Sequence, residues 1–233
     1  MKTKMIAVLM FLLLAGTASA YEEDGGTWSV GLAGGGAFAL GVESGALTGS
    51  EPITNADFDN TIAYSGNVMY RFPSGFTARV EVQHMDLDLG VDWAGSVGSL
   101  STTPVMLLVG YQGMPNEDGI PVDSGFTGHG ELGGGISFNN FDKGSGMDVV
   151  DTLVGGTSDV KIKNGYAFEF GVGGDYFFNR NFSMNLDLRY LLNRAETTGW
   201  NPNLVWVGGG PVRISKVVAD TGQAMLGVRY WFK

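Results

Sequence analysis

Residues 166–192 read YAFEFGVGGDYFFNRNFSMNLDLRYLL, and the spacing of the apolar residues in this stretch decides the fold. Apolar residues fill nearly every second position from Tyr166 to Phe178, and again every second position from Phe182 to Leu192. A period of two residues is that of a β-strand with one apolar face. Only residues 179–181 separate the two runs, so the stretch predicts a β-hairpin with a tight turn.

The same alternation returns in six further segments, residues 28–40, 62–72, 76–82, 105–111, 126–138 and 224–232. Together they give eight candidate strands, and eight strands can close into a barrel. The expected connections differ in length: residues 41–59, 89–100, 139–160 and 193–216 are long, residues 113–125 are intermediate, and residues 73–75 and 179–181 are short turns. One end of the predicted all-β, eight-stranded antiparallel barrel therefore carries the long loops.

Each predicted strand has an aromatic residue on its apolar face near the short-turn end. This girdle consists of Trp28, Tyr70, Phe72, Phe76, Tyr111, Phe126, Tyr176, Phe178, Phe182, Tyr230 and Phe232. A looser ring at the other end consists of Phe38, Tyr64, Phe138, Tyr166, Phe168 and Tyr190. Rings of amphipathic side chains at two heights are typical of membrane interfaces, so we expect a transmembrane barrel with the girdle on the periplasmic side.

The alternative is a soluble barrel of the lipocalin type, with the apolar face turned inward. An eight-stranded barrel has an interior just wide enough for modest side chains. The apolar face is bulky on every strand, whereas the other face is rich in Gly, Ala and Ser, and 38 of the 233 residues are Gly. The small face fits the interior, which favours the membrane barrel.

The N-terminus has the features of a secretory signal peptide. Lys2 and Lys4 precede an apolar run over residues 5–14, and Ala18-Ser19-Ala20 resembles a cleavage site. We therefore expect a cleaved signal over residues 1–20 and a single barrel domain over residues 21–233. Beyond residue 20 the sequence has no apolar run long enough for a spanning helix.

Composition excludes several classes of function. The absence of Cys rules out disulfides and thiolate metal sites, and two His leave little for a His-based metal site. A formal charge of −10 argues against nucleic acid as a partner. Gly34-Gly35-Gly36 and residues 208–210 lack the strand, loop and helix context of a phosphate-binding loop. We expect no metal ion and no cofactor.

Charged residues at inward positions near the short-turn end predict a polar plug, because buried charges persist only when they are paired. Its predicted members are Arg71, Arg79, Glu81, His129, Glu131, Asp175, Asp187 and Arg229. Toward the long-loop end the inward positions become apolar, with Glu169 and Arg189 just beneath. This upper-lumen lining is Met85, Leu87, Met106, Leu108 and Leu191. It is compatible with ordinary packing and with an apolar ligand that enters from outside and leaves sideways.

Two other segments leave alternatives open. His84 faces the lipid near the upper rim, as in lipid A deacylases with a lipid-facing Ser-His pair, but the residue two positions later is Asp86 and the nucleophile is missing. Solvated rim charges or a loose divalent-ion site are the other interpretations, and we expect no enzyme. The segment Trp200–Pro211 fits a ligand-catching lid or, preferably, an extension of the last two strands.

The run from Gly171-Val-Gly-Gly-Asp175-Tyr176 to Arg189-Tyr190 resembles a signature of the OmpW family of outer-membrane proteins. Gly133-Gly-Gly-Ile-Ser-Phe138 and the terminal Gly227-Val-Arg-Tyr230-Trp-Phe232 resemble two others, and the likeness covers about residues 97–232. The family's Leu-Pro-Pro-Thr is replaced here by Leu100-Ser-Thr-Thr-Pro104, and Lys233 follows the final aromatic residue.

The resemblance implies an eight-stranded barrel in the outer membrane of a Gram-negative bacterium, with extracellular long loops and periplasmic turns and termini. It implies a passive channel for small hydrophobic molecules, which enter from outside and leave laterally into the membrane. The expected partners are these molecules, outer-membrane lipids and lipopolysaccharide, and the barrel-assembly machinery. The alternative is a non-transporting surface barrel for adhesion, phage or colicin binding or envelope integrity.

Overall fold

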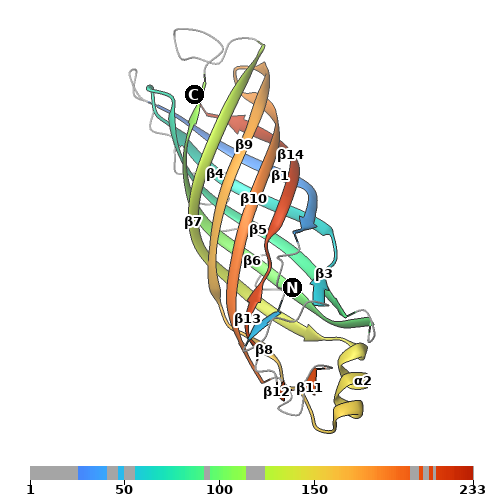
Figure 1. Ribbon diagram of the computed structural model, residues 1–233. Coiled ribbons are helices and arrows are strands. Elements are labelled where there is room, and N and C mark those ends of the chain that lie inside the picture. Colours follow the sequence, from blue (N-terminus) through green and yellow to red (C-terminus); the bar gives the residue numbers. More distant parts are fainter. Residues whose placement is uncertain are drawn as a thin grey trace.

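The computed structural model describes residues 26–40, 47–49, 56–91, 95–113, 124–199, 205–206, 210–211 and 214–232. Eight long antiparallel strands form a closed wall, in which β14 pairs with both β1 and β10 (Figure 1). They are β1 (Thr27–Ala39), β4 (Thr61–Arg71), β5 (Phe76–Val91), β6 (Gly95–Gln112), β7 (Gly125–Lys143), β9 (Gly165–Asn179), β10 (Phe182–Thr198) and β14 (Thr221–Trp231). The predicted antiparallel barrel is confirmed, whereas the predicted signal peptide lies outside the described residues.

The shorter elements gather at the end of the barrel opposite the two tight turns (Figure 1). Four of them add to the wall: β2 (Leu47–Gly49), β3 (Ala56–Phe58), β8 (Lys161–Ile162) and β13 (Ile214–Val218). A helix, α2 (Ser145–Val154), and a separate ladder of β11 (Val205–Trp206) with β12 (Gly210–Pro211) complete this end. The long connections therefore lie at one end of the barrel, as the sequence predicts.

Several predicted boundaries are wrong because the strands are longer than their apolar alternation. β5 continues to Val91 and β6 begins at Gly95, so most of the predicted loop over residues 89–100 is strand. β7 likewise runs to Lys143, into the predicted loop over residues 139–160. The outward residues of these extensions are polar, and on β5 the alternation continues with its apolar residues Met85, Leu87 and Leu89 on the inward side. The outward apolar alternation therefore stops before the strands end. The hairpins therefore project beyond the apolar part of the wall.

The preferred interpretation of the segment Trp200–Pro211 is also wrong. Its described part pairs only with itself, as β11 with β12, and does not extend the last two strands. β10 ends at Thr198, and the next residue, Gly199, has a φ of 81°. That left-handed conformation suits Gly and turns the chain away from the strand direction. The rest of this segment lies outside the described residues.

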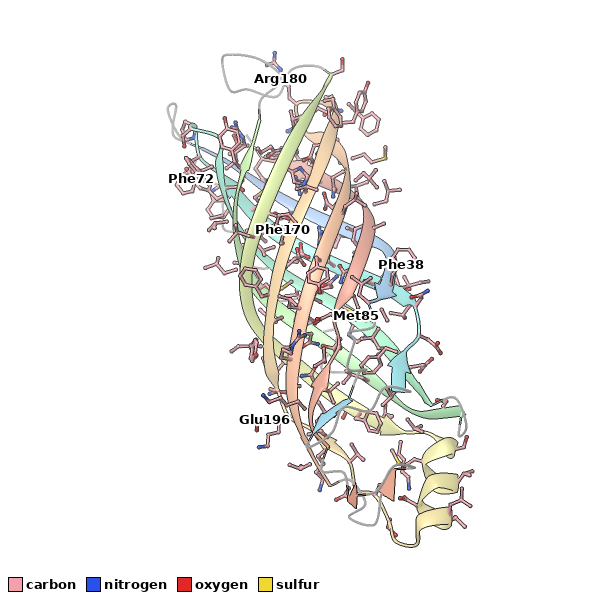
Figure 2. The ribbon with its side chains drawn as sticks, in the orientation of Figure 1. Phe38, Phe72, Met85, Phe170, Arg180 and Glu196 are labelled. Atoms are coloured by element: carbon pink, nitrogen blue, oxygen red, sulfur yellow. The ribbon has the colours of Figure 1, made fainter. Side chains whose placement is uncertain are left out.

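The wall is apolar on its outer face. Leu186, Phe170 and Leu132 on three strands have more than half of their surface exposed, whereas their sequence neighbours Asp187, Glu169 and Glu131 are buried. Figure 2 shows Phe38, Phe72 and Phe170 pointing away from the barrel. A closed barrel with an apolar exterior and a polar interior is a transmembrane β-barrel. The lipocalin-type alternative, which needs the reverse sidedness, is wrong.

The predicted aromatic girdle lies on this outer face at the short-turn end, where neighbouring rings contact each other edge to face. Tyr70 and Phe72 have ring centroids 4.8 Å apart, and Tyr230 and Phe232 have centroids 5.1 Å apart. Such T-shaped contacts add to the burial energy of each ring. Rings also meet between neighbouring strands, since Trp28 and Tyr70 have centroids 4.8 Å apart and Phe182 and Tyr230 have centroids 5.0 Å apart.

Glycine is required where inward positions lie close to a neighbouring backbone. A Cβ atom added to Gly133 or Gly135 on β7 would collide with the carbonyl oxygen of Leu107 or Val105 on β6. These two positions lie in the middle of the β6–β7 ladder, where the wall of a narrow barrel is strongly curved. The high Gly content therefore serves the tight curvature of the wall.

The helix α2 packs on the extended β6 and was not predicted. Met147 is buried in the apolar core of this end, and Lys143 bonds Asp148 at 2.7 Å and Asp151 at 2.9 Å. The hydrogen bond to Asp148 and then that to Asp151 raise the pKa of Lys143 above its usual value. Among the described residues, no helix combines the length and the apolar character that crossing a membrane requires.

Two aromatic residues point inward and close the lumen at the short-turn end, which the sequence reasoning missed. Trp231 and Phe177 are each 1% exposed, their ring centroids lie 5.4 Å apart, and Met69 packs with them. The indole N–H of Trp231 donates to the hydroxyl of Ser183 at 3.0 Å. Trp231 lies between Tyr230 and Phe232, so the aromatic run hides which side chain faces inward. These residues form an aromatic floor.

Replacing Trp231 by Ala should destabilise the barrel by about 3 kcal/mol, because the change leaves a cavity and removes the indole hydrogen bond. The measurement is equilibrium unfolding by denaturant in detergent micelles. Phe232→Ala, which truncates an outward ring of the girdle, is the matched control and should cost much less. Equal losses for the two variants would contradict the assignment of Trp231 to the floor.

Candidate functional site

A network of charged and amide side chains centred on Asp175 lies directly above the aromatic floor. The carboxylate of Asp175 accepts hydrogen bonds from Arg229 at 3.0 and 3.1 Å, from Gln112 at 3.0 Å and from Ser183 at 3.1 Å. A nitrogen of His129 lies 3.0 Å from the same carboxylate. Asp175 is completely buried, so these partners replace the water that its charge has lost. Charged and amide side chains thus fill the lumen at the level of Asp175.

A second layer links two Arg to four carboxylates. Arg189 contacts Glu81 at 2.5 Å and Asp187 at 2.6 Å, and Arg79 contacts Glu131 as well as Glu81 at 3.2 Å. Asp187 also lies 2.9 Å from the other ring nitrogen of His129, which joins the two layers. Cross-barrel pairs of this kind come from strands β5, β7 and β10 and tie opposite walls together.

Glu169 is the least satisfied member of this layer. It is completely buried, and neither carboxylate oxygen accepts a hydrogen bond from any residue in the described ranges. Arg79 and Arg189 approach it at 3.6 and 3.8 Å, which is ion-pair distance without hydrogen bonding. Two guanidinium groups are thus shared among more carboxylates than they can bind bidentately.

All eight side chains predicted for the polar plug face the lumen, but they do not form one cluster. Arg71 is buried near the short-turn end and forms no ion pair with any described residue. Arg189 and Glu169, which the sequence placed beneath the upper lining, lie within the second layer. The parity of each strand located these residues, whereas their pairing across the lumen depends on the stagger of the strands, which the sequence does not reveal.

The predicted upper-lumen lining divides into two groups. All five residues belong to the same buried apolar core, and Met85, Leu87 and Leu191 lie in its part toward the long-loop end. Met106 and Leu108 are equally buried, but they pair with Glu81 and Arg79 on the neighbouring strand, so they lie beside the charged layer and not above it. The prediction that all five lie above the plug is therefore wrong, because the staggered strands bring residues of different sequence depth to one level.

The upper lumen also contains polar side chains that the sequence reasoning missed. The amide of Gln83 donates to the carbonyl oxygen of Gln223 at 2.5 Å. Further out, the hydroxyl of Thr102 contacts Ser137 at 2.8 Å and accepts from Asn193 at 2.9 Å. These residues alternate with the apolar ones along the same strands. The upper lumen is thus a mixed interior, in which apolar side chains alternate with polar ones that bond to neighbouring or opposite strands.

The wall is interrupted between β5 and β6 at Pro104. The two strands pair without a shift in register from Phe76 to Met85, but the pairs opposite Pro104 and Thr103 are missing. Proline has no N–H group and cannot donate to the adjacent strand, so the ladder loses its bonds there. On its other side Pro104 pairs normally with Ser137 of β7. The β5–β6 ladder therefore lacks two pairs at one defined place near the long-loop end.

A polar groove of about 560 Å³ lies on the outer face of the wall next to this interruption. Its lining residues are His84, Asp86, Ser99, Ser101, Thr103, Phe138, Asn139, Asn140 and Asp142. A ring nitrogen of His84 lies 2.9 Å from the hydroxyl of Thr103, and the other lies 3.6 Å from Asp86. The hydroxyl partner of His84 thus comes from the neighbouring strand, where local sequence spacing could not reveal it.

Within the described ranges, no group of three or more His, Asp or Glu side chains is arranged to hold a metal ion. The divalent-ion interpretation of the rim carboxylates thus gains no geometric support.

Comparisons with known proteins support the fold. The outer membrane protein OprG of Pseudomonas aeruginosa has a TM-score of 0.66 and 16% identity, over 90% of this chain and 97% of that one. Neisserial surface protein A has a TM-score of 0.49 and 11% identity, over 88% and 96% of the two chains. The E. coli outer membrane protein W has a TM-score of 0.46 and 14% identity, over 91% of this chain and 100% of that one. At this identity, the likeness to OprG shows a shared fold.

No protein-family model matches the sequence, and a search of curated proteins finds no significant match. The fold shared with OprG agrees with the eight-stranded barrel that the sequence resemblance to the OmpW family implied. Functional conclusions therefore depend on the residues of this chain.

Replacing Arg189 by Met should destabilise the barrel by about 3–5 kcal/mol, because Glu81, Glu169 and Asp187 would keep buried charges without their partner. Denaturant unfolding in micelles measures the loss. Adding Glu81→Gln to this variant should recover part of it, since one of the uncompensated charges is then removed.

Lys163→Met is the control, because its ion pair with Glu196 is exposed and should contribute little. A wild-type unfolding curve for Arg189→Met would contradict the role of this residue in the second layer.

Proposed function

We propose that this chain is an OmpW-type barrel of the Gram-negative outer membrane, which passes small hydrophobic molecules from the extracellular side into the membrane through an opening in its wall. The long connections and α2 would face the outside, and the tight turns and both termini the periplasm. The signal-like N-terminus and the outward apolar wall support this placement. The transfer needs no covalent step and no cofactor.

The interruption at Pro104 is the observation that carries the proposal. Next to it on β5 lies Met85, the first residue after the interruption that pairs with β6 again. On β6, Met106 lies two residues after Pro104. Both Met side chains belong to the buried apolar core of the barrel. A flexible apolar lining therefore borders the part of the wall that lacks ladder hydrogen bonds, and Met side chains adapt easily to irregular ligands.

The layers below the apolar core favour a lateral route. An apolar molecule that continued toward the short-turn end would meet the second charged layer, then the Asp175 network, and finally the aromatic floor. Crossing these layers would separate buried ion pairs at a cost of several kcal/mol. The missing pairs between β5 and β6 offer an exit that leaves all of these contacts intact.

A reversible cross-link across the interruption tests the lateral route, and the chain has no Cys that would interfere. The double variant His84→Cys/Thr103→Cys places two thiols where side chains already touch at 2.9 Å. The oxidised protein should transfer an apolar fluorescent tracer at least about fivefold more slowly, into vesicles with a lipopolysaccharide outer leaflet. Reduction should restore the rate.

The control pair is Val80→Cys/Leu107→Cys, which lies lower on the same two strands where the ladder is complete. Its oxidation should leave the transfer rate unchanged. If the His84/Thr103 cross-link also has no effect, the route does not pass between β5 and β6, and the alternative of a non-transporting surface barrel gains support. The projection of β5, β6 and β7 beyond the apolar wall would then be the surface that partners contact.

A further inference from the structure

The outward residues of β5, β6 and β7 form successive rows across the three strands at the polar groove. The register places Val82, Val105 and Ile136 side by side in one row. The next row outward contains His84, Thr103 and Phe138, followed by a row of Asp86, Ser101 and Asn140. The last row contains Asp88, Ser99 and Asp142.

These rows change from aliphatic to amphipathic to fully polar, in the order that a membrane lipid presents from its chains to its headgroup. The first row continues the apolar wall, since Val80 and Leu107 lie below it and are largely exposed on the outside. A lipid whose acyl chains lie against that wall would therefore place its headgroup in the groove. Phe138, which is 48% exposed, presents an apolar surface at the boundary.

The lining selects the chemistry of the headgroup. Besides His84 and Phe138 it contains hydroxyls, amides and the carboxylates of Asp86 and Asp142, so it lacks the guanidinium and ammonium groups that bind phosphate or sulfate, and its two carboxylates repel an anion. Ser99 and Ser101 place two hydroxyls in this lining, and both residues are partly exposed. Carboxylates and amides accept hydrogen bonds from a ligand, and hydroxyls both accept and donate.

The groove therefore fits an uncharged ligand that carries many hydroxyl groups and one apolar face, which is the description of a pyranose. A sugar hydroxyl can donate to Asp86 or Asp142 and share hydrogen bonds with Ser101 or Asn140. The apolar face of its ring can pack on Phe138. His84 and Thr103 are held by their mutual contact and form a fixed lower edge.

We propose that this groove binds the saccharide headgroup of a membrane glycolipid, whose acyl chains pack on the row of Val82, Val105 and Ile136. This inference depends on the membrane placement in the proposed function, but it does not depend on transport. Because the groove lies beside the Pro104 interruption, a bound glycolipid would border the lateral opening.

Native mass spectrometry of the full chain in an uncharged polyether detergent tests the proposal. The probe is digalactosyl diacylglycerol, compared with phosphatidylglycerol and phosphatidylcholine that carry the same acyl chains. The wild-type protein should retain the glycolipid about tenfold more tightly than either phospholipid, which corresponds to one or two additional hydrogen bonds. Ser99→Ala/Ser101→Ala removes two hydroxyls without adding bulk to the groove, and should reduce retention of the glycolipid to the phospholipid level.

Glu196→Gln on β10 is the matched control, because it changes a polar outward residue at the same end of the barrel but outside the groove. It should retain the glycolipid as the wild type does. Phe138→Leu provides a second test, since it keeps the hydroxyls and carboxylates but removes the aromatic surface, and should weaken retention about threefold. Far-ultraviolet circular dichroism checks that each variant is folded.

Equal retention of the three lipids by the wild type would overturn the proposal, as would wild-type retention by the Ser99/Ser101 double variant. Tracer transfer by the cross-linked proteins separates this outcome from failure of the proposed function. Selective glycolipid binding without any effect of the His84/Thr103 cross-link would contradict the lateral route and support the groove as a glycolipid-binding site. An effect of the cross-link on tracer transfer without selective glycolipid binding would contradict only the proposal that the groove binds a glycolipid.

Discussion

The structure depends on the narrow interior of a closed eight-stranded wall. Closure pairs the backbone of each long strand on both sides, which a bilayer demands because it offers no water to unpaired N–H and C=O groups. The same closure leaves little room inside, so inward positions hold many Gly, Ala and Ser residues, charged side chains that bind one another across the lumen, and a limited set of Met, Leu and aromatic side chains. Most of the bulky aromatic residues then face outward, where lipid accommodates them. Sidedness, glycine content and the buried ion pairs thus follow from one geometric limit.

The buried charges give the lower half of the barrel its particular character. Asp175 is satisfied by Arg229, Gln112 and Ser183, whereas Glu169 is only approached by Arg79 and Arg189. The interior is therefore tightly bonded near the aromatic floor and less satisfied toward the middle. Above these layers the wall itself changes, because Pro104 removes pairs from the β5–β6 ladder. In the proposed function this charged base directs apolar ligands toward the missing pairs between β5 and β6, and in the further proposal the groove beside those pairs binds a lipid headgroup.

Much of the fold could be predicted from the alternation of apolar and small residues, since one parity of each strand must face lipid. The lengths of the strands could not be predicted from the sequence, because β6 from Gly95 to Pro104 has few apolar residues to mark its outer face. Trp231 was missed because aromatic residues flank it on both sides, although the alternation that places Tyr230 and Phe232 outside also places Trp231 inside. The parity also placed Leu108 inside the barrel, but not beside Arg79, since that proximity depends on the stagger of the strands around the closed wall. For the same reason the contact of His84 with Thr103, and hence the groove, could be found only in three dimensions.

Lipid-phase quenching of two single-tryptophan proteins tests the sidedness of the wall most directly. One protein keeps only Trp28, on the outer face, and the other keeps only Trp231, in the aromatic floor, with the remaining Trp residues replaced by Phe. In vesicles of brominated phospholipid, the fluorescence of Trp28 should be strongly quenched, and that of Trp231, 1% exposed and enclosed by the wall, should be nearly unaffected. Quenching of Trp231 as strong as that of Trp28, or an unquenched Trp28, would contradict an apolar exterior in contact with lipid and an interior closed by paired charges.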